Sequence, residues 1–294
     1  MIVLNEKEYA ERCLITGELD KKPYNTLLIL GKYYYHCLGY RKKRIVDLLT
    51  LYLEKNYPRY RANVLAWTDT IERIALKAGK HPLYEISEIW ITRSELDVID
   101  KVDASDELKR LAFVMLCLAK LGNLKSAKNN GWVNTKTEDI FTLARISACK
   151  KRQCEMLGDL NILGLVDCPV KIDNLSHRIT FVDESENSEK VIAISDFREL
   201  GYAYLKYKGE NIVHCASCDI LIRGNKNGTK KYCSACAGYV PVTEQKKIIA
   251  CIDCGEEFEV NSKNNKTHRC ASCQKKYRVD YQREIMREQR HKTE

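Results

Sequence analysis

The stretch HCASCDILIRGNKNGTKKYCSACA, residues 214–237, sets the strongest constraint on how the last third of this 294-residue chain folds. It contains two C-x-x-C pairs separated by 14 residues, and CIDCGEEFEVNSKNNKTHRCASC, residues 251–273, repeats the pattern with 15 residues between its pairs. Two thiolates three positions apart in a tight turn can face one ion, and two such turns complete a tetrahedron around Zn2+. The spacing therefore predicts two zinc ribbons with one structural ion each. The predicted ligands are Cys215, Cys218, Cys233, Cys236, Cys251, Cys254, Cys270 and Cys273.

Other chemistries of paired cysteines fit the chain less well. Four disulfides need an oxidising compartment, repeated C-x-x-C pairs favour zinc over an iron–sulfur cluster, and a thioredoxin-like site needs a βαβ context. Four thiolates leave no open position for water, so the zinc is expected to support folding and not catalysis. The spacing favours pairs combined in sequence order and leaves an interleaved arrangement open. The other six cysteines are expected in the core; they are Cys13, Cys37, Cys117, Cys149, Cys154 and Cys168.

The C-terminal third is basic, which indicates a polyanionic partner or a well-solvated surface. Residues 201–294 hold 18 Lys and Arg against 11 Asp and Glu, a net of +7 out of +9 for the chain. Residues 223–231 and 261–269 have the composition of hairpin tips and indicate duplication of one module. Residues 274–292 favour a basic helix that contains Tyr277 and Tyr281.

Two interpretations of this basic end remain open. Cations mixed with tyrosines suit phosphate binding with base stacking. A solvated terminal helix fits as well, because Glu284 with Arg287 and Glu288 with Lys292 are spaced to pair along a helix. The predicted nucleic-acid contacts in this region are Arg269, Lys275, Lys276, Arg278 and Arg283.

The middle of the chain, residues 105–182, shows three helical segments followed by a hairpin. The expected helices begin after Ser105, at Thr137 and near Cys149, with Gly122 ending the first and Gly164 the third. Within this region MLGDLNILGLV, residues 156–166, resembles the end of a recognition helix and the entry to the wing in winged helix-turn-helix domains.

That resemblance implies that the start of the third helix faces the major groove of DNA. Lys and Arg suit phosphate or guanine contacts, and Gln suits adenine. The contacts implied are Lys150, Lys151, Arg152 and Gln153, with Arg178 or His177 in the wing. Winged helices that bind only proteins keep the alternative open that these cations are ordinary surface residues.

The N-terminal part is expected to be helical. The patterns predict helices over residues 24–38, from Arg41 to before Pro58, and from a capping Asp69 to Gly79. This unit is similar to the helical domain found C-terminal to some phage and plasmid primases, a likeness that bears on architecture only. Further on, residues 86–91 and 191–194 favour strands, Thr92 begins a capping box, and a helix is expected over residues 196–208.

These patterns together predict an α+β chain. It has a mostly helical N-terminal part, a winged helix-turn-helix middle, two small four-cysteine zinc ribbons and a basic C-terminal helix. The expected boundaries are 1–84 for the N-terminal helical domain, 85–209 for the winged-helix-like domain with its linking helix, 210–240 and 241–274 for the ribbons, and 275–294 for the basic helix.

Several function classes find no support in the sequence. The longest apolar run, residues 111–119, is too short to cross a bilayer, and the acidic N-terminus does not resemble a signal peptide. We therefore expect a cytoplasmic protein without a membrane partner. The motifs of P-loop NTPases, zinc proteases, serine hydrolases and HNH nucleases were not found, so we expect no enzymatic activity.

Taken as a whole, the chain resembles uncharacterised proteins of bacteriophages and mobile elements in Gram-positive bacteria. The residues that carry the likeness are DFRELGYAYLKYKGENIVHCASC (196–218), KKYCSACA (230–237) and CIDCGEEFEV with HRCASCQKKYR (251–278). The second ribbon departs from the single one expected in such proteins, which indicates an added contact surface.

The leading expectation is a zinc-containing, non-catalytic DNA-binding protein that acts in replication or transcription control. The ribbons and basic helix would add phosphate affinity or bind a polymerase or helicase. The alternative is an adaptor or inhibitor that binds a host complex, such as RNA polymerase or a defence effector. Its support is the same mixture of zinc modules and tyrosine-rich helices.

Overall fold

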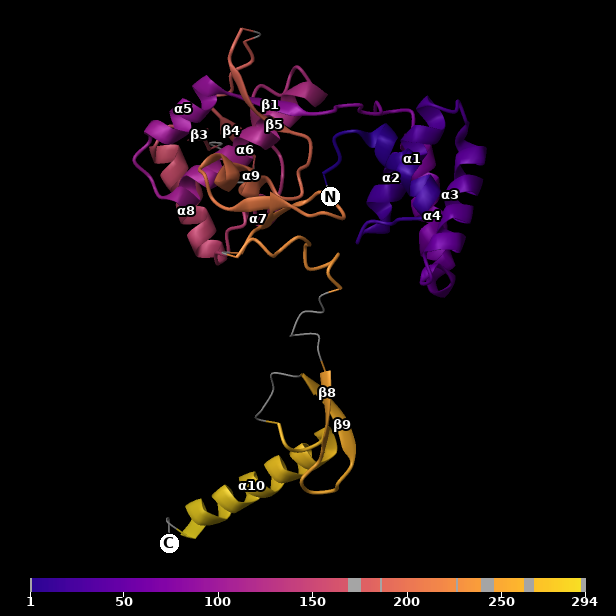
Figure 1. The fold of residues 1–294 in the computed structure, drawn as a ribbon. Coiled ribbons are helices and arrows are strands. Elements are labelled where there is room, and N and C mark those ends of the chain that lie inside the picture. Colours follow the sequence, from indigo (N-terminus) through magenta and orange to yellow (C-terminus); the bar gives the residue numbers. More distant parts are fainter. Residues whose placement is uncertain are drawn as a thin grey trace. The chain divides into compact units, whose positions relative to one another are not determined.

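The computed structural model describes residues 2–168, 176–185, 187–225, 227–238, 246–261 and 267–291. It combines helices with small antiparallel sheets, as the expected α+β class requires. The chain forms two compact units, Met1–Cys215 with Asp219–Lys231, and Ala216–Cys218 with Tyr232–Glu294. Each unit is described by itself below (Figure 1).

The first unit begins with a bundle of helices around an apolar core of their own. The core contains Leu27, Leu30, Leu49, Leu53 and Ile71, each at most 1% exposed. Burying side chains of this size contributes about 1.5–3 kcal/mol each. This packing stabilises short helices that would be only marginally stable in isolation. The elements are α1 (Glu6–Thr16), α2 (Pro23–His36), α3 (Lys42–Asn56), the 3-10 turn η1 (Tyr60–Asn63) and α4 (Val64–Lys77).

Two details of this bundle differ from the sequence predictions. Helix α4 begins at Val64, so the predicted start at a capping Asp69 is wrong. The 3-10 turn η1 leads directly into the helix and leaves Asp69 inside it. Helix α1 was not predicted, because it buries only four residues, one of them the charged Glu6. That carboxylate accepts a hydrogen bond of 2.7 Å from the buried Nζ of Lys32 on α2.

Helix α6 (Asp106–Lys125) lies at the centre of a second core in the first unit. Eleven of its residues are buried, and α5 (Arg93–Lys101), α7 (Thr137–Leu143), α8 (Lys150–Ile162) and α9 (Leu200–Tyr207) pack against it. The helix continues past Gly122, so the prediction that Gly122 ends it is wrong. A Cβ atom at this position would lie 2.5 Å from Nδ2 of Asn129, so a larger residue would displace that amide from its hydrogen bonds to Asn123 and to the Trp132 carbonyl.

A three-stranded sheet completes the middle of the chain. Along the sequence the order is α6, β2 (Trp132–Val133), α7, α8, β3 (Val166–Asp167) and β4 (His177–Ile179). The strands are arranged β2-β4-β3, all antiparallel, with Val133 opposite His177 and Val166 opposite Ile179. The predicted hairpin is present as β3 and β4, and residues 169–175 between them lie outside the described part. Strand β2 was missed because a two-residue strand has no periodicity to detect.

A second sheet pairs β1 (Ile89–Thr92) with β5 (Lys190–Ile194) in antiparallel register. The capping box at Thr92 is present as predicted, with Glu95 bonded back to the Thr92 N–H. Helix α9 begins at Leu200 and not at Asp196, because Oδ1 of Asp196 accepts from the Arg198 N–H and holds a turn there. Tyr204 of α9 is fully buried 5.3 Å from the ring of Phe113, so this helix belongs to the core as well as contacting the next hairpin.

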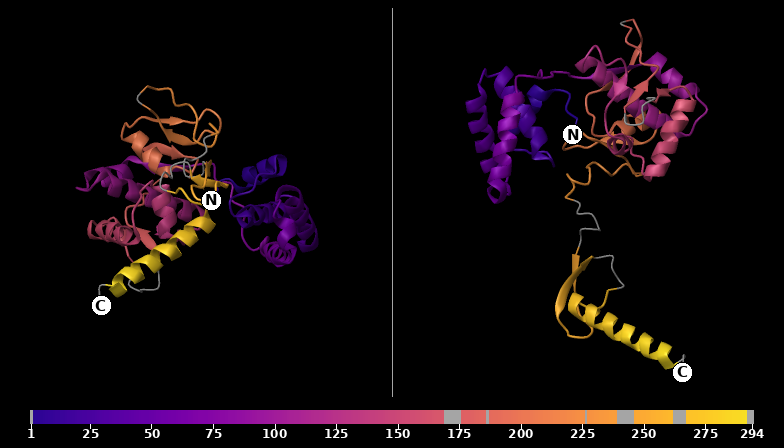
Figure 2. Two further views of the ribbon diagram at one scale, coloured as in Figure 1. Left: turned by 90° about the horizontal axis from the view of Figure 1, so that it is seen from below. Right: turned by 180° about the vertical axis from the view of Figure 1, so that it is seen from behind.

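Two further hairpins carry the first cysteine pair of each predicted ribbon. They are β6 (Ile212–His214) with β7 (Leu221–Arg223), and β8 (Lys246–Ala250) with β9 (Glu257–Asn261). In both, the C-x-x-C pair itself forms the tip, so the hairpin tip predicted at residues 223–231 is wrong. The one predicted at residues 261–269 falls largely outside the described residues. In the second unit, α10 (Ala271–His291) follows as a long helix (Figure 2).

Candidate metal centres and cationic surfaces

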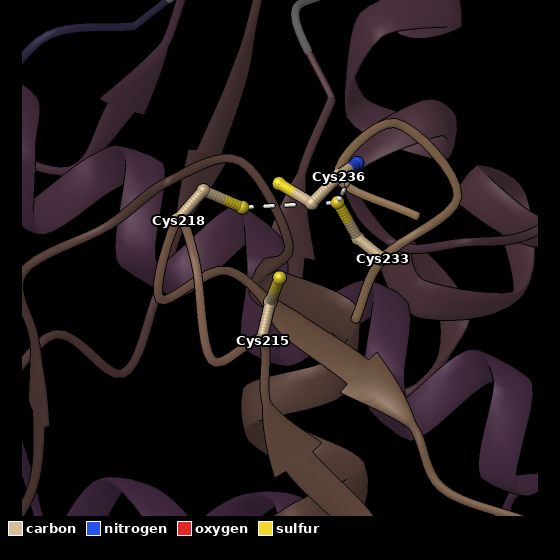
Figure 3. A group of neighbouring side chains, drawn as sticks. All are labelled: Cys215, Cys218, Cys233 and Cys236. Atoms are coloured by element: carbon tan, nitrogen blue, oxygen red, sulfur yellow. Dashed lines mark hydrogen bonds between the residues drawn. The ribbon is translucent and has the colours of Figure 1, made fainter. Parts of the chain in front are cut away.

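The first cysteine group consists of Cys215, Cys218, Cys233 and Cys236, whose sulfur atoms all lie within 4.8 Å of one another. Figure 3 shows the four side chains converging, with Cys215 at the end of β6 and Cys218 in the turn that follows. The Asp219 N–H donates to the Cys215 carbonyl (2.9 Å), and Asp219 takes a left-handed φ of 57°. This tight turn aims both sulfur atoms of the pair to one side.

The second group, Cys251, Cys254, Cys270 and Cys273, is built in the same way. The Gly255 N–H donates to the Cys251 carbonyl (2.8 Å), and the φ of Gly255 is 72°, a conformation that favours glycine. Cys270 precedes α10 and Cys273 lies in its first turn. The Ile252 N–H donates to the His268 carbonyl (3.0 Å), which brings the two pairs together.

The pKa values in this second group differ from one thiol to the next. The Cys270 N–H, 3.3 Å from Sγ of Cys251, lowers the pKa of Cys251 to about 6. The Ser272 hydroxyl, 3.1 Å from Sγ of Cys270, lowers the pKa of Cys270. Thiol hydrogen bonds to Cys254 and Cys270 raise the pKa of Cys273 to about 12. Like charges this close repel, so full ionisation of the group needs a cation among the four sulfur atoms.

The geometry of both groups fits a tetrahedral metal ion. The sulfur–sulfur distance is 3.7 Å from Cys218 to Cys233 and also 3.7 Å from Cys254 to Cys270. Each group takes its two pairs in sequence order, which answers the question that the spacing left open. All eight predicted ligands are therefore placed in two groups that can each hold a metal ion.

The predicted contacts on α8 are exposed at the start of that helix. Met156, Leu157 and Leu160 are buried and anchor the helix on α6 and β3. The Lys150 side chain is 87% exposed, with Nζ 3.8 Å from Glu138, and Arg152 pairs with Glu155 at 3.3 Å on its own helix. Lys151 is exposed too, and among the described residues it has no ion-pair partner.

Two other residues predicted to contact DNA have local roles. The amide of Gln153 donates to the Ala148 carbonyl (3.0 Å) just before α8, and its side chain is only partly exposed. Arg178 lies on the central strand β4, where Nε donates to the Asn130 carbonyl (3.1 Å) and Nη1 lies 3.4 Å from Asp167. These contacts fix the loop before β2 and the edge of the sheet.

The remaining residues predicted to contact nucleic acid lie in the second unit. Nε of Arg269 is 2.7 Å from Oδ2 of Asp253, and the guanidinium lies over the ring of Tyr277, 4.2 Å from its centroid. Arg283 pairs with Asp280 at 3.5 Å. Along the first half of α10 the side chains of Lys275, Lys276 and Arg278 are exposed. Side chains from Glu284 onward, and Lys292, lie outside the described part, so the pairs predicted there stay predictions.

The cysteines outside the two groups only partly match their predicted place in the core. Cys13 and Cys117 are buried, and burial raises the pKa of both thiols. The other four are exposed, so their prediction is wrong. They lie at helix ends, on the outer face of α8 or just after β3, where a small side chain needs no burial. These four are Cys37, Cys149, Cys154 and Cys168.

Sequence reasoning also missed a hollow of about 370 Å3 in the first unit. Its largely apolar lining comes from β5, α9 and the β6–β7 hairpin, and includes Val191, Ala203 and Leu221. On its wall Nζ of Lys206 lies 3.0 Å from Nε2 of His214. The lining residues come from three separate elements, so no local motif in the sequence indicates the hollow.

Comparison with protein-family models, with curated proteins and with solved structures gives no match for this chain. Among the described helices, none combines the length and apolar character needed to cross a membrane.

Proposed function

We propose that this is a zinc-containing, non-enzymatic DNA-binding protein of phage or mobile-element origin, acting in replication or transcription control. The order of elements in the middle of the first unit carries the proposal. The three helices are α6, α7 and α8, with the short strand β2 after the first of them and the hairpin β3–β4 after the third. The three strands form one sheet in the order β2-β4-β3. This is the arrangement expected of a winged helix-turn-helix domain, with α8 as the recognition helix.

The way α8 is held supports this role. One face of the helix is fixed by Met156, Leu157 and Leu160, while the cations Lys150, Lys151 and Arg152 are exposed at its start. Cations at a helix N-terminus are mildly unfavourable, because they oppose the positive end of the helix dipole. A phosphate backbone would offset that cost and would make binding strongly salt-dependent.

We propose zinc as the ion of both cysteine groups. Tetrahedral coordination with Zn–S bonds of about 2.3 Å separates the sulfur atoms by about 3.8 Å, close to the 3.7 Å found in each group. Four thiolates fill the coordination sphere, so zinc would hold the turns together and leave no position for a reacting water. The ribbons then act as folded supports for the basic α10 and for contacts with a polymerase or helicase.

The test is binding of the zinc-loaded protein to a labelled DNA duplex, measured by electrophoretic mobility at two salt concentrations. Reversing the charges of Lys150, Lys151 and Arg152 to Glu should weaken binding at least tenfold or so and reduce the salt slope by about 2–3. A matched control reverses Lys42, Lys43 and Arg44, three exposed cations at the start of α3. Equal losses in the two variants, or no loss in the α8 variant, would show that α8 is not the recognition helix.

A second candidate function is an adaptor or inhibitor that binds a host complex. Large apolar side chains exposed on the N-terminal bundle favour it, with Ile15 at 86% and Leu65 at 85%. A pull-down from lysate with and without nuclease separates the two functions. A partner that stays bound after nuclease treatment, together with absent duplex binding at low salt, would favour the adaptor.

A further inference from the structure

The second unit carries a row of planar side chains beside its cysteine group. Arg269 immediately precedes the ligand Cys270, and its guanidinium is held by Asp253 at 2.7 Å. One face of that guanidinium covers the ring of Tyr277 at 4.2 Å from the centroid. The Arg269 side chain is 26% exposed, so the start of the row is fixed against the module.

The row continues along α10. Tyr277 and Tyr281 are one helical turn apart, and their rings are nearly parallel, with an interplanar angle of 12° and centroids 6.2 Å apart. Both rings are open to solvent, with Tyr277 46% and Tyr281 53% exposed. Exposing an aromatic ring to water is unfavourable, and covering it is favourable. Two exposed rings on one helix face therefore indicate a surface that binds something flat and apolar.

Cations flank this row on both sides. At 100° per residue, Lys276 and Arg278 lie on either side of the helix face that presents Tyr277, and both side chains are exposed. A ligand that covers the rings therefore meets positive charge along its edges. The one described acid close by on α10, Asp280, is already paired with Arg283 at 3.5 Å.

From this juxtaposition we infer that Arg269, Tyr277 and Tyr281 form a stacking site for the unpaired bases of single-stranded nucleic acid, whose phosphates lie against Lys276 and Arg278. Every base has a flat face, and base–aromatic stacking is tolerant of sequence. In a duplex these faces are covered by neighbouring bases and only base edges are presented in the grooves. The inference rests on the proposed nucleic-acid function but assigns a different strand form and a site separate from α8.

The test uses the full zinc-loaded chain and fluorescence anisotropy with labelled oligonucleotides of about 20 nucleotides. The three probes are single-stranded DNA, the RNA of the same sequence, and an abasic strand with the same number of phosphates. Stacking predicts binding to DNA or RNA that is at least about fivefold tighter than to the abasic strand. Equal binding to all three would mean that only phosphates are contacted, and would overturn the inference.

Variants locate the contact. Tyr277→Leu and Tyr281→Leu keep an apolar side chain and should each weaken single-strand binding about 5- to 100-fold, whereas Tyr→Phe at the same positions should leave it nearly unchanged. Arg269→Lys keeps the charge and loses the planar face, so a smaller loss of about two- to fivefold is expected. Tyr24→Leu, a tyrosine 41% exposed on α2, is the matched control. Zinc content and circular dichroism show whether each variant is folded.

The result of the single-strand experiment can be distinguished from that of the duplex experiment. The charge reversal on α8 should leave single-strand binding within about twofold of the parent, and the tyrosine variants should leave duplex binding equally unchanged. If the leucine variants bind single strands like the parent while the α8 variant loses the duplex, the stacking site is refuted and the DNA-binding proposal is not. If a partner protein stays bound after nuclease treatment and is lost in the Tyr281→Leu variant, this surface binds a protein, and the inference is overturned.

Discussion

Replacing Glu95 with glutamine is expected to destabilise the first unit by about 3–5 kcal/mol. The Glu95 carboxylate is fully buried between β1, α6 and the segment before β5. Its Oε1 accepts from Nζ of Lys120 (2.8 Å) and from the Asp183 N–H (2.9 Å), and its Oε2 accepts from the Thr92 N–H (2.8 Å). One side chain thus satisfies donors from three parts of the chain.

The magnitude follows from what an amide can offer at this place. Glutamine has one acceptor oxygen, so in either orientation its NH2 group faces a buried donor. Losing a hydrogen bond to a charged group costs about 1.5–3 kcal/mol, and a buried donor left unsatisfied costs about 1–3 kcal/mol more. Lys120, only 12% exposed, also loses its counter-charge. These contributions overlap, which gives about 3–5 kcal/mol for the substitution.

Thermal and denaturant unfolding followed by circular dichroism measure the effect. A loss of this size should lower the Tm by about 6–20 °C. Glu107→Gln is the matched control, since that side chain is 63% exposed in the first turn of α6, and its change should stay within about 0.5 kcal/mol. Lys120→Met should also destabilise, and the double variant should lose at least about 1 kcal/mol less than the two single losses added together. A Glu95→Gln loss below about 1 kcal/mol would refute the reasoning.

Two further predictions concern the metal groups and the acid dependence of stability. Cys233→Ser should lower the bound zinc from about two ions per chain to about one, measured by metal analysis after dialysis against a weak chelator. The control Cys37→Ser, which lies outside both groups, should keep both ions. An unchanged zinc content in Cys233→Ser would contradict the assignment. Hydrogen bonds from Ser188 and Ser94 hold the pKa of Asp183 below its ordinary range. The stabilisation they give is present above the unfolded pKa near 3.9 and is lost as the pH falls below it. Asp183→Asn should therefore be less stable than the parent at about pH 7 by denaturant midpoint, with the difference shrinking toward about pH 3; a constant difference would exclude this origin.

The elements that the sequence predicted well are those whose signal is local. The C-x-x-C pairs identified the eight cysteines that gather in two groups able to hold a metal ion, because each pair closes a turn within four residues. The buried face of α6 followed from helical periodicity, but its end did not. Gly122 resembles a helix terminator in the sequence, whereas in the structure it lies inside the helix, where a Cβ atom would press on the Asn129 amide. Strand β2 escaped prediction because it depends on pairing with β4, about 45 residues further along the chain.

The sequence predicts where cationic residues lie along the chain. It does not predict which of them already interact with neighbouring residues in the fold. Arg178 is engaged by Asn130 and Asp167, and Gln153 by Ala148. These partners are close in space, and in the case of Asn130 far apart in sequence. Lys151 and Arg178 therefore look alike in the sequence. Of these two, Arg178 pairs with Asp167, whereas Lys151 has no ion-pair partner in the described part of the chain. Availability depends on tertiary contacts, which no spacing rule contains.

The two cysteine groups share a ligand set but differ in what else holds them. The β6–β7 hairpin packs against α9, whose Tyr204 is buried in the core around α6, so apolar packing supports this hairpin independently of a metal. In the described part of the second unit the buried apolar residues are Val260 and the ligands Cys251 and Cys270. So small a core contributes only a few kcal/mol, too little to offset the entropy of ordering about 40 residues. We therefore expect the fold of β8, β9 and α10, and with it the row of Tyr277 and Tyr281, to depend on an ion bound by the four cysteines.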